Sequence, residues 1–255
     1  MNPGRRPELA RALLALADDE LILGHRDSEW TGHAPILEED IAFANIALDE
    51  IGHAALWYRL VAELLGEDPE RHPDRLVFHR SADGFRNVRL VEFPKGDWAF
   101  TIVRQYLFDS AEQVRLRALA DHPQASVAQT AAKIQVEERY HLRHMHAWVT
   151  RLAQGTPESR QRMQTALEEL WSPAQQLFQP LPEQAVLASE SLWPAFEPLS
   201  RQWSAEVVGY LTGCGLALPA DAGVNPEGRD VHTPDLDTLL ADMQSVARLE
   251  PQAAW

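Results

Sequence analysis

Apolar residues recur at helical spacing along two long stretches near the start of the chain, residues 7–26 and 37–65. Residues three and four positions apart share one face of an α-helix, so each stretch predicts an amphipathic helix. Glycine and proline in residues 28–35 break the pattern between them, and Gly66 followed by Pro69 ends the second stretch. The two stretches are therefore expected to form an antiparallel helical hairpin.

A second pair of helices is predicted further along the chain. Helical periodicity returns in residues 98–120 and again in residues 125–153. The residues between them, 121–124, include Pro123 and are typical of a tight turn. These two helices are therefore expected to run antiparallel as well.

The segment between the two pairs, residues 68–97, has a different character. It is rich in proline and glycine and has little helical periodicity. We expect it to be a long crossover, and loops of this length usually have a function or pack against the rest of the protein. Two apolar runs within it, residues 76–78 and 88–91, are predicted to be short extended pieces.

The chain after the second pair is predicted to be mostly helical. Apolar residues at helical spacing indicate helices over residues 158–178, 201–216 and 236–249. Residues 179–198 are rich in proline and lack this periodicity, so no helix is predicted there.

Charged residues interrupt the apolar faces of the first two helices. Glu50 lies at the centre of the apolar face of its helix, and His53 lies one turn further along the same face. Glu20 interrupts the face of the first helix in the same way. Burying an unpaired charge is costly, so each of these groups needs a partner. Taken singly, each could belong to a buried ion pair, and Glu20 could be a carboxylate near a helix end.

The second pair of helices repeats this arrangement. Glu138 lies at the centre of an apolar face, with His141 three residues later. On the preceding helix, Asp109 lies at the edge of the apolar face, whereas Glu112 points roughly to the opposite side, which favours Asp109 as a ligand. An ion pair between Asp109 and an arginine such as Arg104 is an equally good interpretation.

The joint pattern is a carboxylate on the first helix, Glu-x-x-His on the second, a carboxylate on the third and Glu-x-x-His on the fourth. This is the ligand plan of four-helix bundles that hold two iron or two manganese ions. Mixed nitrogen and oxygen ligation suits Fe(II) or Mn(II). The expected cofactor is therefore a di-iron or di-manganese centre, with buried hydrogen-bonded pairs as the alternative. The predicted ligands are Glu20, Glu50, His53, Asp109, Glu138 and His141.

These patterns predict an all-α protein with a ferritin-like four-helix bundle, a long crossover and extra C-terminal helices. Nothing in the pattern marks a second folded domain. We expect one domain over residues 1–255, with a core bundle at about 7–155 and additional packed helices at about 158–255.

Composition and charge exclude several classes of function. The net charge of −15 argues against a nucleic-acid-binding protein, because such proteins concentrate lysine and arginine. No apolar run reaches the ~20 residues of a membrane span, and no signal-peptide pattern follows the first residues. The single cysteine, Cys214, excludes an intrachain disulfide framework and fits a reducing cytoplasm.

The chain also resembles a known family over nearly its whole length. It is similar to the C-type subunits of the multicomponent phenylacetyl-CoA epoxidase, which are ferritin-like. The resemblance is carried by matching residues within 29–40 (EWTGHAPILEED), 44–49, 104–106, 139–143, 232–233 and 240–244, and by Trp255.

The resemblance implies a cytoplasmic complex in which a ferritin-like A-type subunit holds the working di-iron centre. That complex epoxidises the aromatic ring of phenylacetyl-CoA with O2 and electrons from an NADPH-fed reductase. The C-type subunit resembles the A-type subunit in fold and is its structural partner, commonly with eroded metal ligands. This sequence departs from that pattern, because Glu20 and both Glu-x-x-His motifs remain available, which a purely scaffolding subunit would not need.

Two functions therefore compete. The first is a structural, partner-binding subunit of the oxygenase, which contacts the A-type subunit, together with further subunits of the complex, or forms a homodimer when isolated. Its partner surface is expected among the first helices and the loop of residues 30–35. The second is a self-sufficient di-metal oxidase or ferroxidase that uses its own Glu-x-x-His pairs.

Overall fold

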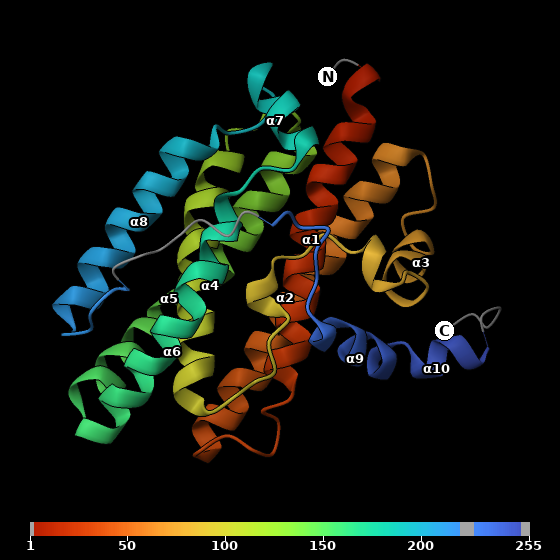
Figure 1. Cartoon of the computed structure of the whole chain (residues 1–255). Helices are drawn as coiled ribbons and strands as arrows, with labels where there is room; N and C mark the ends of the chain where they lie inside the picture. Colours follow the sequence, from red (N-terminus) through yellow and green to blue (C-terminus); the bar gives the residue numbers. More distant parts are fainter. Residues whose placement is uncertain (1–2, 220–226, 251–255) are drawn as a thin grey trace.

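The two predicted hairpins are formed by four long helices, which make up the bundle in the computed structural model (Figure 1): α1 (Arg6–Ser28), α2 (Leu37–Leu65), α4 (Trp98–Leu119) and α5 (Ala125–Gln154). The structure describes residues 3–219 and 227–250, so Trp255 lies outside the described residues. All regular secondary structure within those residues is helical, which confirms the all-α prediction. None of the helices in these ranges is both long and apolar enough to cross a membrane.

The helix ends follow from local sequence signals. Gly66 ends α2 in the left-handed region at φ 74°, where glycine has no Cβ penalty. Asp97 precedes α4 and accepts a hydrogen bond from the amide of Phe100 at 2.9 Å. An aspartate at this position satisfies one of the free amides of the first turn.

The crossover differs from the prediction. Residues 76–78 are not extended but belong to a short helix, α3 (His72–Phe78). Its second residue is Pro73, whose fixed φ suits the first turn. In the second run, Val88 has an extended backbone, while Arg89–Val91 form a 3-10 turn. Val88, Leu90 and Val91 are fully buried. Burial against the bundle, which local periodicity does not report, therefore decides the shape of both runs.

The C-terminal region also contains more elements than predicted. It comprises α6 (Pro157–Gln175), α7 (Pro182–Ser189), α8 (Phe196–Gly213), α9 (Pro234–Met243) and α10 (Ser245–Leu249). Helix α7 lies in the stretch predicted to lack a helix, and its start is set by Pro182. The single helix predicted over 236–249 is broken at Gln244, whose buried side chain donates to the carbonyls of Val77 and Arg80 at 2.8 and 2.9 Å.

Helices α6, α7 and α8 cover one side of the bundle. Helices α6 and α8 pack against α4, and α7 packs against α1 (Figure 1). As a result α1 and α4 are buried nearly all round, including their polar residues. Helices α2 and α5 keep an exposed face. This arrangement places the acidic residues of α1 and α4 deep inside the protein.

Two consecutive acids of α1 attach the outer segments to the bundle. Asp18 accepts hydrogen bonds from Tyr58 of α2 at 2.6 Å and from the backbone amide of Arg86 in the crossover at 2.8 Å. Asp19 accepts from the amide of Val88 at 2.7 Å and from Arg229 at 2.9 Å. Both carboxylates are fully buried, so they join parts of the chain that are far apart in sequence.

Candidate metal centre

Three helices of the bundle bring carboxylates and a histidine into one buried cluster. Glu20 comes from α1, Glu50 and His53 from α2, and Glu138 from α5. One potential ligand atom from each lies within 4.8 Å of the others. None of the four residues is more than 1 % exposed. The spacing of three or four residues places each group on the inward face of its helix.

The approach of α1 to α2 is closest beside this cluster. A Cβ atom added to Gly24 would lie 2.9 Å from the Cβ of Glu50 and 3.0 Å from the Cγ1 of Ile51. Gly24 lies one turn after Glu20 on α1. The absence of a side chain at Gly24 therefore lets the two glutamates share one site.

His141 joins the cluster from α5. Its Nδ1 lies 3.0 Å from Oε1 of Glu138 and 3.5 Å from Oε1 of Glu50. His53 faces the same carboxylates through its own Nδ1, which lies 3.4 Å from Oε1 of Glu138 and 3.7 Å from Oε2 of Glu20. The two imidazole rings are 6.0 Å apart between centroids. Both histidines thus turn the same ring nitrogen toward the buried carboxylates.

The opposite ring nitrogens meet acids at the edge of the bundle. His53 bonds through Nε2 to Glu137 of α5 at 2.8 Å, and His141 bonds through Nε2 to Asp49 of α2 at 3.2 Å. Asp49 directly precedes Glu50 on α2 but contacts His141 of α5. In the same way, Glu137 directly precedes Glu138 on α5 but contacts His53 of α2. Carboxylates in this position orient metal-binding histidines and raise their basicity. Neither acid is among the ligands predicted from the sequence, although an acid directly precedes each Glu-x-x-His motif.

The two acids considered as ligands on the third helix of the bundle, α4, lie in different surroundings. Asp109 accepts a hydrogen bond from the side-chain amide of Gln105 at 2.8 Å, and the same Nε2 group donates to Glu50 at 2.9 Å. Glu112 contacts Arg115 instead. Arg104 pairs with Asp27, so it does not neutralise Asp109. Asp109 therefore borders the cluster, whereas Glu112 belongs to a neighbouring ion pair.

Protons balance the charges of the cluster when no metal is bound. Burial, assisted by the negative charge of Glu50, raises the pKa of Glu20 well above its usual value. Burial likewise raises the pKa of Asp109, helped by Glu138. Burial alone would lower the pKa of His53 and of His141, but the surrounding carboxylates raise both well above the ordinary value. Metal binding must therefore displace protons from the cluster.

Several polar atoms of the cluster have no hydrogen-bond partner although they are buried. Both carboxylate oxygens of Glu20 are in this state, as are one oxygen each of Glu50, Asp109 and Glu138 and the Nδ1 of His53. Buried polar atoms are normally paired, so such a concentration at one place calls for an explanation. Oxygen and imidazole nitrogen donors are the set that Fe(II) and Mn(II) accept. The residues present fit a metal centre.

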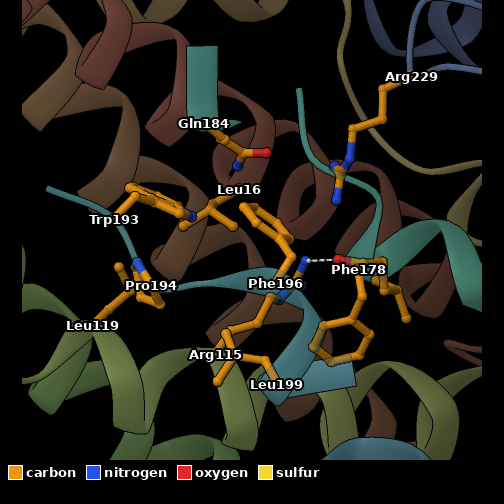
Figure 2. A pocket seen from close by; sticks show the side chains of 11 residues that line it. Leu16, Arg115, Leu119, Phe178, Gln184, Trp193, Pro194, Phe196, Leu199 and Arg229 are labelled. Atoms are coloured by element: carbon orange, nitrogen blue, oxygen red, sulfur yellow. Dashed lines mark hydrogen bonds between the residues drawn. The ribbon is translucent and has the colours of Figure 1, made fainter. Parts of the chain in front are cut away.

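A separate cavity lies between α1, α4 and the C-terminal segments (Figure 2). The residues that line it include Leu16, Trp193 and Phe196, together with Arg115 and Arg229. Its volume of about 10 Å³ is enough for at most one water molecule. This cavity is therefore too small to hold an organic substrate.

The fold and the cluster together define a ferritin-like carboxylate bundle with two Glu-x-x-His motifs. The chain belongs to the phenylacetic acid catabolic protein family, whose sequence profile matches residues 1–255. It is 37% identical over 249 residues to the C subunit of the 1,2-phenylacetyl-CoA epoxidase of Escherichia coli K12, a match that spans 97% of this chain and 99% of that protein. It is 28% identical over 193 residues to the A subunit of the same epoxidase, a match that spans 75% of this chain and 60% of that protein. The resemblance seen in the sequence is thereby confirmed.

Proposed function

We infer that the chain is the C-type subunit of a multicomponent oxygenase that epoxidises the aromatic ring of phenylacetyl-CoA. The observation that carries this function is the similarity to the E. coli C subunit over nearly the full length of both chains. Its role in the complex is structural: it binds the A-type subunit, whose active conformation it supports. The reaction uses O2 and electrons that derive from NADPH, which favours the cytoplasm as the location.

The partners of the chain are the A-type subunit, together with further subunits of the complex. The similarity of the chain to both C and A subunits supports a pairing of two related bundles. A homodimer is the form that the isolated chain would take. The ties of Asp18 and Asp19 to the crossover and to Arg229 support one domain over residues 1–255.

A retained metal site is a second proposal for this chain. Glu20, Glu50, His53, Asp109, Glu138 and His141 would hold two ions of iron or manganese. When bound, such a centre supplies the capacity to react with O2. The chain's own contribution is to keep the two histidines oriented through Asp49 and Glu137 and to exclude water by burial.

This ligand set favours one alternative function, a self-sufficient di-metal oxidase or ferroxidase. Its support is the concentration of buried oxygen and nitrogen atoms without a hydrogen-bond partner in the cluster, which a purely structural protein does not need. The two functions differ in what they require. A structural subunit needs its partner for activity, whereas a self-sufficient oxidase reacts with O2 alone.

The first experiment mixes the purified chain with an A-type subunit of the family and the reductase. We expect a stable complex in size-exclusion chromatography with light scattering, and epoxidation of phenylacetyl-CoA that depends on the chain. A chain that remains separate, and that consumes O2 in the presence of Fe(II) without any partner, would instead support the oxidase.

The second experiment measures metal content after expression with iron and manganese supplied. We expect about two ions per chain for the wild type. Glu138→Ala removes a carboxylate that lies between both histidines, so it should lower the content by about half or more. Glu112→Gln, which alters a buried acid outside the cluster, should leave it unchanged. Equal and low metal content in all three proteins would refute the proposed metal site but would not affect the proposed partner.

A further inference from the structure

One face of the bundle remains uncovered within the described residues. Helices α6, α7 and α8 cover the side formed by α1 and α4, whereas α2 and α5 carry the exposed residues. Large apolar side chains on this face are unusually accessible. Their exposed fractions are 73% for Leu37, 56% for Ile41, 68% for Leu48 and 40% for Ile51 on α2, and 48% for Val136 and 67% for Tyr140 on α5.

The apolar residues of α2 form a regular outer row. Leu37, Ile41, Ala44, Leu48, Ile51 and Ala55 are separated alternately by four and three residues. The opposite face of the same helix packs its own apolar residues, such as Phe43 and Trp57, into the core. A solvent-facing side of a surface helix is normally polar. An apolar row with this alternating spacing is the seam to which another helix packs.

The charges on the face are divided between the two helices. From Leu37 to Trp57, helix α2 contains no lysine or arginine, and Glu38 and Asp49 are accessible there. Helix α5 instead exposes Lys133, Arg139 and Arg143, together with one half-exposed acid, Glu137. A partner built on the same bundle and related by an approximate two-fold axis can place its own basic helix over the acidic one. The layout therefore favours a related chain over an unrelated apolar ligand.

We propose that the outer face of α2 and α5, with Leu37, Ile41 and Leu48 at its centre, is the docking surface for the A-type subunit. This inference rests on the proposed function and names where that partner binds. The A-type subunit is the related chain to which this protein is also similar, so it has the helices that such a pairing needs.

Docking at this face covers the outer edge of the candidate metal centre. Asp49 and Glu137, which bond to His141 and His53, have side chains that are 46% and 42% exposed. Exposure to water weakens the hydrogen bonds of such groups, and burial strengthens them. The A-type subunit therefore shields the acids that orient the two histidines.

The test compares surface variants of the full chain in binding to the purified A-type subunit. Leu48→Glu and Ile41→Glu each place a charge within the apolar row, and both residues are exposed, so the variants should fold as the wild type does by circular dichroism. We expect each to raise the Kd by more than about tenfold. Leu249→Glu is the matched control, because Leu249 is 80% exposed on α10, outside this face.

Charge reversal provides an independent arm of the same test. Arg143→Glu on α5 should slow association and weaken binding more at low salt than at high salt. If the A-type subunit binds the wild type and both α2 variants equally well, the docking surface is wrong while the proposed function stands. If the α2 variants alter only self-association of the chain, the face is a homodimer interface and the proposal is overturned. If the wild type does not bind at all, the proposed function fails together with this inference.

Discussion

The histidines of the cluster are held from both sides. Nδ1 of His53 and of His141 faces the buried glutamates, and Nε2 of each bonds to an acid of the opposite helix. This exchange couples α2 to α5 through side chains rather than through apolar packing alone. The orientation of both rings is thereby set in the folded protein before any ligand arrives.

A buried acid near this cluster makes the stability of the protein depend on pH. Burial raises the pKa of Asp27 to about 7, although Arg104 at 3.4 Å opposes the shift. At pH values between the ordinary pKa of an aspartate and about 7, the folded state therefore binds the proton of Asp27 more tightly than the unfolded state does. The stabilising contribution of Asp27 is complete at acidic pH and is lost as the pH rises through about 7.

Asp27→Asn tests this dependence because asparagine does not titrate. The free energy of unfolding of the wild type, relative to that of the variant, should fall by up to roughly 4 kcal/mol as the pH rises from about 4 to about 7. Urea unfolding of both metal-free proteins across this range measures the difference. If the free energies of unfolding of the two proteins changed in parallel with pH, or if the advantage of the wild type grew with pH, the raised pKa of Asp27 would be contradicted.

Among the elements, α1 carries the most demanding set of interactions. Three consecutive acids, Asp18, Asp19 and Glu20, are all fully buried, because the helix is surrounded on every side. The first two bond to the crossover, and the third faces the candidate metal centre. Helix α1 can contact the crossover and also contribute Glu20 to the cluster only because it approaches α2 closely at Gly24.

Gly24→Ala tests the close approach of the two helices. The new Cβ would meet the Cβ of Glu50 at 2.9 Å, and a Cβ cannot rotate away. Overpacking costs about 1–3 kcal/mol and should outweigh the ~1 kcal/mol that alanine gains in a helix. Thermal or urea unfolding should therefore show a net loss of stability.

Gly209→Ala in α8 provides the control for this change. No atom lies within 4 Å of a Cβ added there. The variant should gain about 0.5–1 kcal/mol from helix propensity alone. If both variants were stabilised equally, the approach of α1 to α2 would not be as close as the structure indicates.

The whole molecule is held together by charges as well as by its apolar core. Asp19 is the meeting point of α1, α4, the crossover and the C-terminal region, through Arg115, Val88 and Arg229. Few local signals mark such a contact, because its members are far apart in sequence. It explains why the crossover follows a defined path over the bundle.

Asp19→Ala should be strongly destabilising. It leaves Arg115 and Arg229 buried with reduced compensation, and breaking one partner out of a buried ion pair costs about 3–5 kcal/mol. Denaturant unfolding measures this loss. The comparison is Glu197→Ala, which removes an exposed pair with Arg201 and should cost less than about 0.5 kcal/mol. A loss for Asp19→Ala as small as that of the control would show that Asp19 does not hold these segments.

Hydrophobic periodicity alone determined the four bundle helices, their antiparallel pairing and the inward position of the two Glu-x-x-His motifs. These features are local, because a helix places residues three and four positions apart on one face whatever surrounds it. The same reasoning located Glu20 and favoured Asp109 over Glu112. The family resemblance was likewise readable from short stretches of sequence.

Only the tertiary structure decided which polar groups meet. The exchange of Asp49 and Glu137 between opposite helices, and the burial of Asp18 and Asp19, depend on contacts across the bundle. Helix α3, helix α7 and the break at Gln244 arise in the same way, because burial and distant hydrogen bonds outweigh local preference there. The outer apolar row of α2 could be recognised only from the sequence and the tertiary structure together. The sequence contains its spacing, but only the packing of the other helices leaves it exposed.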